Sequence, residues 1–191
     1  MTTKVEFDHQ RRLDRRDRRR AHYRRGLRSM AIAGWNTTKE HNVGTLVRTA
    51  HAAAAEEVIL VGDREWNIEA AKTAQDFTDV TFLEDEHAFL DHVRNRGWSL
   101  VAVELDSCAV SLFEAEYPEN PCFLLGAERD GLPRSLIDAA EIVVQIPQWG
   151  LVPCLNLAVA GSIVLYDYLA KQQRKGALDR PEGGLVPEED S

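Results

Sequence analysis

Short apolar runs that alternate with helical segments constrain the fold of this chain more than any other feature. Six such runs are present, and the segments between them carry apolar residues at helical spacing. A buried parallel strand is a continuous apolar run, because helices cover both faces of its sheet. The alternation therefore predicts an α/β fold, with a mostly parallel sheet and helices on both faces. We expect the strands at residues 30–35, 57–61, 80–83, 98–103, 122–125 and 142–146.

Helical spacing and composition divide the chain into an arm, a body and a tail. With 191 residues the chain is long enough for one domain with a substantial core. We expect a basic arm at 1–29, one domain at 30–175 and an acidic flexible tail at 176–191, where Gly, Pro and acidic residues dominate. Helices are expected at 9–28, 42–55, 68–74, 86–96 and 154–166.

Positive charge is concentrated at the amino-terminal end of the chain. The whole chain has a net charge of −8, but residues 1–30 hold eleven basic and four acidic side chains, a net charge of +7. A basic arm on an acidic body is typical of RNA binding by the arm, because Lys and Arg make the phosphate contacts. The alternative is a solvated, salt-bridged helix. The side chains expected to contact RNA are Arg15, Arg16, Arg18, Arg19, Arg20, Arg24 and Arg25.

Several classes of protein and site are disfavoured by what the sequence lacks. No apolar run has the length of a membrane helix, and the basic amino terminus lacks the apolar segment of a secretory signal, so we expect a cytoplasmic protein. Three cysteines without metal-ligand spacing indicate reduced thiols and no metal site. Neither a G-x-G-x-x-G fingerprint nor a Walker lysine loop is present, so ordinary dinucleotide binding is not supported.

Residues 121–171 read as strand, loop, strand, loop and helix. This order builds a ligand pocket at the carboxyl ends of parallel strands. Gly126, Gly131 and Gly150 lie in the two polar loops. Glycine at such positions lets backbone groups approach a ligand closely, although each glycine would also serve simply to close a turn.

Three runs in this chain carry a family resemblance. They are NVGTLVRTA at 42–50, LLGAERDGLP at 124–133 and IPQWGLVPCLNLAVAGSIVLY at 146–166. In order and spacing they resemble the three motifs of the SpoU/TrmH branch of SPOUT RNA methyltransferases, and the resemblance covers roughly residues 30–171. It implies a C-terminal trefoil knot, with the last helix threaded through a loop, and a homodimer with its pockets at the interface. Sequence reasoning alone would reject a knot, because knots are so rare.

The resemblance also implies a cofactor, S-adenosyl-L-methionine, bound in a bent form mostly by main-chain groups. Cys154 departs from the family pattern, which usually has Ser two residues before the Asn of the third motif. A thiol is a weaker hydrogen-bond donor than a hydroxyl, so the expected role of this position rests on its backbone. A covalent role for Cys154 lacks a positioned His partner. The positions that would bind the cofactor are Val103, Leu125, Gly126, Ile146, Pro147, Cys154 and Leu155.

Four polar residues are the candidate catalytic set: Arg48, Glu128, Asn156 and Asn42. A guanidinium is a poor general base, so we expect Arg48 to hold the phosphate beside the target ribose and to stabilise the forming alkoxide. Without the motif, Arg48 would be a surface residue paired with Glu40. The resemblance makes Glu128 a loop organiser near the substrate and Asn156 a residue that orients the phosphate or Arg48. Asn42 would act at a helix start, where capping is an equal alternative.

These observations predict an S-adenosylmethionine-dependent RNA methyltransferase that acts on a ribose 2′-hydroxyl of tRNA or rRNA. The absence of a large separate RNA-binding domain favours tRNA over rRNA. A non-catalytic RNA-binding or assembly factor with the same fold is the alternative, and methylation of a base is a third possibility. Methyl transfer from a sulfonium needs no metal.

Overall fold

A parallel sheet of seven strands forms the centre of the molecule. The computed structural model describes residues 4–36, 40–62, 68–127, 130–151 and 154–178. The sheet has the order β3-β2-β1-β6-β4-β7-β5, and in the described ranges every neighbouring pair is parallel. This confirms the mostly parallel sheet expected from the apolar runs. The strands are β1 (Arg28–Trp35), β2 (Ala55–Val61), β3 (Asp79–Leu83), β4 (Ser99–Val103), β5 (Val110–Ser111), β6 (Pro121–Leu125) and β7 (Ile142–Gln145).

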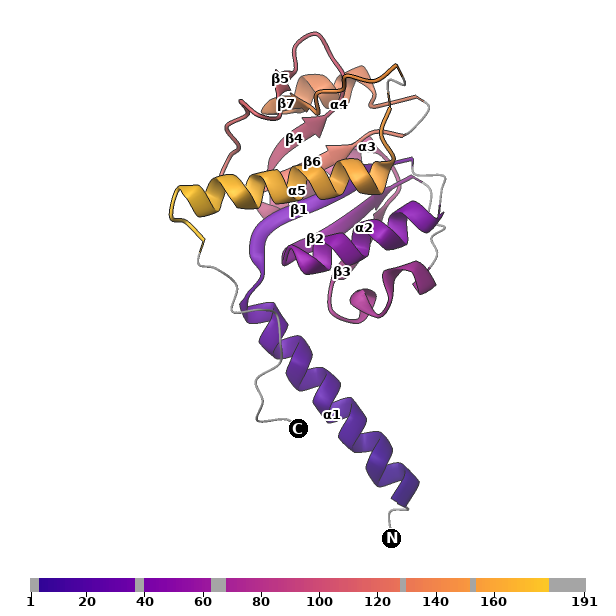
Figure 1. Ribbon diagram of the computed structural model, residues 1–191. Helices are drawn as coiled ribbons and strands as arrows, with labels where there is room; N and C mark the ends of the chain where they lie inside the picture. The colour runs from indigo at the N-terminus through magenta and orange to yellow at the C-terminus, as the bar shows by residue number, and fades with distance from the viewer. Residues whose placement is uncertain (1–3, 37–39, 63–67, 128–129, 152–153, 179–191) are drawn as a thin grey trace.

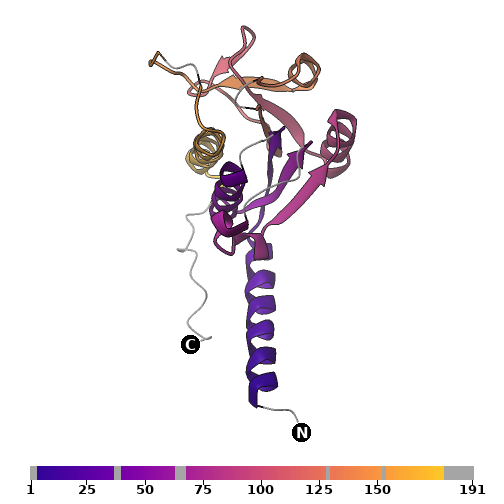
Figure 2. The ribbon, with the colours of Figure 1, turned by 90° about the vertical axis from the view of Figure 1, so that its right-hand side faces the viewer.

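Helices cover both faces of the sheet, as expected (Figures 1 and 2). One core lies under α2, α5 and the 3₁₀ turns, and a second lies under α3 and α4. Alternate side chains of β1 enter the two cores, with Ile32 in the first and Ala33 in the second, because successive strand residues point to opposite faces. The elements are α1 (Lys4–Arg25), α2 (Glu40–Ala52), η1 (Ile68–Ala71), η2 (Ala74–Asp76), α3 (Glu86–Arg96), α4 (Arg134–Ala139) and α5 (Leu157–Arg174).

Four elements differ clearly from the sequence-based expectation. The helix expected at 68–74 is two 3₁₀ turns, interrupted where Lys72 and Thr73 both have positive φ. Neither β5 nor α4 was expected, because two and six residues are too few to show a periodic pattern. The last helix begins at Leu157 and runs to Arg174, later at both ends than expected.

Helix α5 packs closely against α2 and the sheet. An added Cβ at Gly161 would lie 2.5 Å from Leu46 Cδ1 and 3.1 Å from Ile32 Cδ1, so glycine sets the approach of the helix. Thr49 Oγ1 and Ser162 Oγ also share a hydrogen bond of 3.1 Å between the two helices. The start of α5 is thereby fixed beside the ends of the central strands.

The second half of α5 is hydrogen-bonded to the segment that leads into β6. Lys171 Nζ donates to the carbonyl of Ala115 at 3.0 Å and contacts Asp167 at 2.8 Å. The Tyr117 hydroxyl donates to Asp167, and the Tyr168 hydroxyl donates to the carbonyl of Glu119. The pKa of Tyr117 is raised, first by burial and then by its bond to the carboxylate. These bonds satisfy the polar groups that the helix buries.

Candidate functional site

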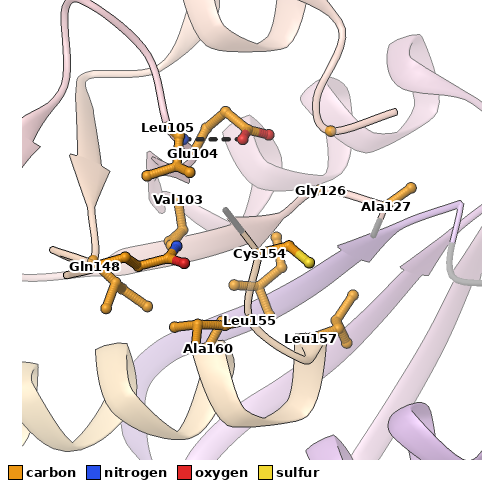
Figure 3. Close-up of a pocket in the computed structure, with 13 residues that line it drawn as sticks. Val103, Glu104, Leu105, Gly126, Ala127, Gln148, Cys154, Leu155, Leu157 and Ala160 are labelled. Atoms are coloured by element: carbon orange, nitrogen blue, oxygen red, sulfur yellow. Dashed lines mark hydrogen bonds between the residues drawn. The ribbon is translucent and has the colours of Figure 1, made fainter. Parts of the chain in front are cut away.

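A pocket opens where β4, β6 and β7 end. Its volume is about 360 Å³, and its walls come from the ends of these strands and from the start of α5 (Figure 3). It lies at the edge where the strand–loop pattern predicted a ligand site. Six of the seven positions proposed for the cofactor line it: Val103, Leu125, Gly126, Ile146, Cys154 and Leu155.

The seventh position, Pro147, lines an adjoining hollow of about 350 Å³. The two hollows share Leu105, Ile146 and Gln148, so they form neighbouring parts of one depression. Gly150 lines the second part, and nothing lies within 4 Å of a Cβ added there. The structure therefore brings together every position proposed for the cofactor.

Glu104, which the sequence analysis did not single out, also lines the pocket. It directly follows β4, and its carboxylate lies against residues 126–127 and 130–132 after β6, which we call the glycine loop. Oε1 accepts a hydrogen bond from the Leu105 amide and Oε2 accepts one from the Leu132 amide, both at 2.9 Å. A signal for Glu104 was available, because it is an acidic residue at the carboxyl end of a buried strand.

Two of the loop glycines make room for this carboxylate. A Cβ at Gly126 would lie 2.8 Å from Glu104 Oε2, and a Cβ at Gly131 would lie 2.7 Å from it. Gly131 also has a φ of +65°, which L side chains rarely adopt. The sequence predicted that these glycines let the backbone approach a ligand closely. In the structure, the group that approaches both of them is the Glu104 carboxylate of the same chain.

A second contact joins the segment after β4 to α4, the helix that follows the glycine loop. Asp106 Oδ1 accepts from the Cys108 amide at 2.9 Å, and Asp106 Oδ2 contacts Arg134 Nη1 at 3.1 Å. Hydrogen bonds from the Cys108 thiol and amide, together with the Arg134 charge, lower the pKa of Asp106. Asp106 and Arg134 do not line the pocket.

The two candidate catalytic asparagines are in contact. Asn156 Nδ2 donates to Asn42 Oδ1 at 2.8 Å. Asn156 is the N-cap of α5, and its Oδ1 accepts from the amides of Ala158 and Val159. Asn42 lies in the first turn of α2, which begins at Glu40.

Arg48 is exposed on α2, and among the described residues its side chain has no hydrogen-bond or ion-pair partner. It does not line the pocket of its own chain. Its suggested partner Glu40 has a side chain outside the described set, and Glu128 lies wholly outside the described residues. Within a single chain, Asn42 and Asn156 are therefore in contact, and Arg48 is not among the residues that line the pocket.

The cysteines and acidic residues give no metal site within the described ranges, where no group of three or more potential ligands is found. Cys154 is an exposed free thiol at the pocket, Cys108 is exposed and Cys122 is buried. Burial raises the pKa of Cys122, and nearby Glu57 raises it further. The described helices include none that is long and apolar enough to span a bilayer.

Several large apolar side chains are exposed, and some of them lie at the pocket or beside its residues in the chain. The ring of Trp149 is stacked on Phe113, with centroids 6.4 Å apart, although the two residues are 85% and 64% exposed. Leu105 lines the pocket itself and is also exposed. Exposed apolar patches of this kind mark interaction surfaces. Further exposed members are Val110, Leu151, Val159 and Tyr166.

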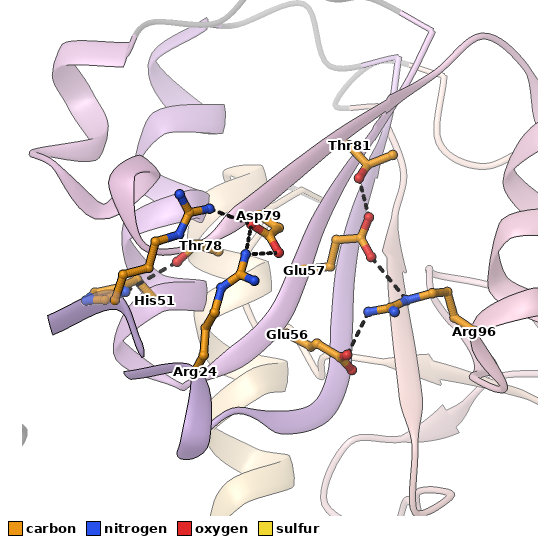
Figure 4. Close-up of polar contacts among 9 residues, drawn as sticks. Arg24, His51, Glu56, Glu57, Thr78, Asp79, Thr81 and Arg96 are labelled. Atoms are coloured by element: carbon orange, nitrogen blue, oxygen red, sulfur yellow. Dashed lines mark hydrogen bonds and ion pairs between the residues drawn. The ribbon is translucent and has the colours of Figure 1, made fainter. Parts of the chain in front are cut away.

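The basic arm, helix α1, projects away from the body at the amino-terminal end of β1 (Figures 1 and 2). Its base is anchored to the body. Arg24 Nη2 lies 2.9 Å from both carboxylate oxygens of Asp79, and Arg20 Nη2 lies 3.1 Å from one of them. Tyr23 donates to the carbonyl of His51 at 2.9 Å, with ring centroids 4.3 Å apart. Figure 4 shows Arg24, Asp79 and His51 together.

Of the seven arginines proposed for RNA, Arg20 and Arg24 thus pair with Asp79 of the body. Within the helix, Arg16 contacts Asp17 at 4.0 Å and Arg25 Nη2 lies 3.2 Å from His22 Nδ1. Figure 4 also shows a separate polar cluster on the neighbouring strand. Glu57, only 5% exposed, contacts His92 Nε2 at 3.1 Å, Arg96 Nε at 3.4 Å and the Thr81 hydroxyl. These partners satisfy a buried carboxylate inside the sheet.

Comparison with known proteins identifies relatives over most of the chain. The model of the SpoU rRNA Methylase family matches residues 29–166. A tRNA (guanosine(18)-2′-O)-methyltransferase of Escherichia coli strain K12 is 30% identical over 153 residues, which are 78% of this chain and 66% of the relative. A 23S rRNA (guanosine-2′-O-)-methyltransferase of Bordetella pertussis is 28% identical over 141 residues, 71% of this chain and 57% of the relative. The chain thus spans about two thirds or less of these two relatives.

Solved structures share the fold. An Aquifex aeolicus TrmH/SpoU tRNA modifying enzyme matches with a TM-score of 0.76 at 24% identity, covering 92% of this chain and 90% of the other. An AdoMet-bound rRNA methyltransferase from Sinorhizobium meliloti matches with a TM-score of 0.69 at 28% identity, covering 81% and 58%. The similarity extends over the sheet and its helices.

Proposed function

The chain belongs to the SpoU rRNA methylase family, and from this membership we propose that it is an S-adenosylmethionine-dependent RNA methyltransferase that modifies a ribose 2′-hydroxyl. One observation carries the proposal: six of the seven positions that the family resemblance assigns to the cofactor line a single pocket. The relatives from Escherichia coli and Bordetella pertussis are named as 2′-O-methyltransferases of tRNA and 23S rRNA, which supports the reaction type.

The pocket suits the methyl donor. Its volume of about 360 Å³ lies in the usual range for small-molecule sites. Its walls combine apolar side chains such as Val103 and Leu157 with main chain at Gly126 and Ile146, which fits an adenosine held by backbone groups. When bound, S-adenosylmethionine supplies an electrophilic methyl group on a sulfonium. The Sinorhizobium meliloti structure, named as AdoMet-bound, supports this choice of cofactor.

We assign Arg48 to the target phosphate and to the forming alkoxide. A guanidinium stays charged at neutral pH, so it binds and stabilises anions rather than taking a proton. Asn156 and Asn42, already in contact, would orient the phosphate or Arg48, and Glu128 would organise the loop beside the substrate. Because Arg48 does not line the pocket of its own chain, we infer that Arg48 of a second copy serves it.

A homodimer follows from this inference. The exposed apolar side chains at the pocket or beside its residues in the chain, including Trp149 and Leu151, give the second copy a surface on which to pack. Sedimentation of the full chain tests the dimer, and a monomer at all working concentrations would refute it. We further propose that α5 is threaded as a trefoil knot, supported by the family membership and by the hydrogen bonds of Lys171 and Tyr168 to the segment before β6.

The substrate proposed is RNA, with tRNA favoured over rRNA, in the cytoplasm and without a metal. Residues 1–29 would act as an RNA-binding arm, 30–175 as the catalytic domain and 176–191 as a tail. Since Arg20 and Arg24 contact Asp79, we assign the RNA contacts chiefly to the outer part of the arm, with Arg15, Arg16 and Arg19. Arg18 is proposed to act with them, and Arg25, the last residue of α1, is proposed as a further RNA contact at the base of the arm.

Three measurements test the proposal. Calorimetry with S-adenosylmethionine measures donor binding, and transfer of a labelled methyl group to total tRNA or rRNA measures turnover. Mass analysis of the product nucleoside distinguishes ribose from base, because a ribose methyl stays with the sugar fragment. Donor binding with turnover on a ribose is expected. RNA binding without donor binding would instead identify a non-catalytic RNA-binding factor.

A further inference from the structure

Glu104 links three separate parts of the pocket wall. Its backbone amide donates to the carbonyl of Val144 in β7 at 3.0 Å, so the residue is fixed to the neighbouring strand. Its carboxylate accepts from the amide of Leu105 at 2.9 Å and from that of Leu132 in the glycine loop at 2.9 Å. The ends of β4 and β7 and the loop after β6 therefore converge on one side chain.

The loop accommodates this carboxylate because two of its residues are glycines without side chains. A Cβ atom at position 126 would lie 2.8 Å from Glu104 Oε2, and one at position 131 would lie 2.7 Å from it, which is too close for either side chain. Gly126 itself lines the pocket, and so does Gly131. The position of the glycine loop relative to β4 thus depends on a group that fits only against glycine.

The chemistry of the contact requires a carboxylate. Both partners are N–H donors, and an ionised carboxylate offers an acceptor oxygen to each. The nearly isosteric Gln offers one acceptor oxygen and one NH₂ group, which would face an N–H. Replacement by Gln therefore keeps the volume of the side chain, but one backbone N–H then faces the NH₂ group of Gln and loses its acceptor.

We propose that Glu104 is a positioning residue for the methyl donor: it holds the glycine loop and the end of β4 at the separation that the cofactor needs. The inference rests on the proposed function, because the loop and the strand end are two walls of the proposed cofactor pocket. Glu104 acts on the donor through the backbone of Gly126 and Gly131.

The experiment compares the full-length wild type with Glu104→Gln and Glu104→Ala. Arg134→Ala is the control, because it removes the ion pair that joins α4 to Asp106, two residues after Glu104, without touching the pocket. Calorimetry with S-adenosylmethionine measures donor affinity, hydrogen exchange measures the protection of the Leu105 and Leu132 amides, and thermal melting measures stability. Methyl-transfer kinetics at varied donor concentration separate KM from kcat.

Glu104→Gln should weaken donor binding by about tenfold or more, raise the KM for the donor more than it lowers kcat, and speed exchange at Leu132. Arg134→Ala should bind the donor as the wild type does. Wild-type affinity in Glu104→Gln would overturn the positioning role alone, as would a collapse of its melting temperature, which would mark a structural role. A wild-type chain that binds no donor would refute the proposed function and this role with it.

Discussion

The side chain of Asn156 donates a 2.8 Å hydrogen bond to Oδ1 of Asn42, across 114 residues of chain. Its own Oδ1 accepts from two amides at the start of α5. One side chain therefore both caps the last helix and connects it to α2, the helix that carries Arg48. The two asparagines are a unit, and substitutions can separate the cap from the connection.

Asn156→Ser should keep the cap and lose the connection. Serine is a good N-cap residue but is too short to reach Asn42. We expect stability near that of the wild type and methyl transfer reduced by about tenfold or more, because misplaced catalytic groups lose rate steeply. Asn156→Ala should in addition cost about 1 kcal/mol of stability. Thermal melting and methyl transfer measure the two effects, and full activity in Asn156→Ser would contradict the role of the connection.

Arg48→Ala should abolish methyl transfer and leave the fold and the dimer intact. The side chain is exposed, and such substitutions usually change stability by less than about 0.5 kcal/mol. Arg94→Ala, on the exposed side of α3, is the control for loss of a surface guanidinium. Turnover of the substrate RNA and sedimentation are the measurements. Unchanged turnover in Arg48→Ala would remove it from the catalytic set.

Gly161→Ala should destabilise the protein by about 1–3 kcal/mol, because its methyl group would meet Leu46 Cδ1 at 2.5 Å and two further side chains at 3.1 Å. Leu46 is fully buried and cannot move aside freely. Gly150→Ala is the matched control, since nothing lies within 4 Å of its added Cβ. Denaturant unfolding measures both variants. Equal stabilities would show that α5 packs less tightly than the distances indicate.

Acid should weaken the anchor of the arm through His51. Burial lowers the pKa of His51 below its ordinary value of 6.5, so the unfolded chain binds this proton more tightly than the folded chain does. The stability that His51 contributes is therefore fully present above about pH 6.5 and is lost as the pH falls through the folded pKa. The drop in melting temperature between about pH 7.5 and about pH 5.5 should be smaller in His51→Gln. An identical drop would exclude His51 as its source.

Deletion of residues 1–19 should weaken RNA binding and spare donor binding. The cut removes the outer part of the arm but keeps Tyr23 and Arg24, which hold its base on the body. Affinity should fall most at low salt, because phosphate contacts release counterions. Asp79→Asn is the control: it removes the ion pairs of the base and keeps all the arginines. Equal RNA affinity with and without residues 1–19 at low salt would disprove the role of the arm.

The sequence predicts most of the sheet because buried parallel strands are unbroken apolar runs. Ala31 to Gly34 in β1 and Cys122 to Leu125 in β6 are such runs, and they pair side by side. The two-residue β5 carries no such signal, since its pairing with Val144 and Gln145 is fixed by the chain around it. A strand was therefore predictable from the sequence only where its apolar run was long enough to be recognised.

The sequence predicts the pocket positions that lie in a motif or at the end of a strand. It does not predict contacts between side chains that are far apart in the sequence. Gly126 and Cys154 were placed from local runs. The contact of Arg24 with Asp79 joins residues 55 positions apart, and that of Glu104 with Leu132 joins residues 28 apart. No local pattern encodes such pairs, because they arise from the register of strands that are neighbours only in the folded sheet.

Helix α5 supplies Leu157 and Ala160 to the pocket, and it is the last of the described elements to leave the ribosome. A nascent chain can complete its sheet earlier, since all seven strands precede this helix. It still lacks one side of the cavity until Leu157 and Ala160 have been added and the helix that carries them has packed. Truncated translation products that stop before α5 would therefore be inert towards RNA modification, however well their strands had paired.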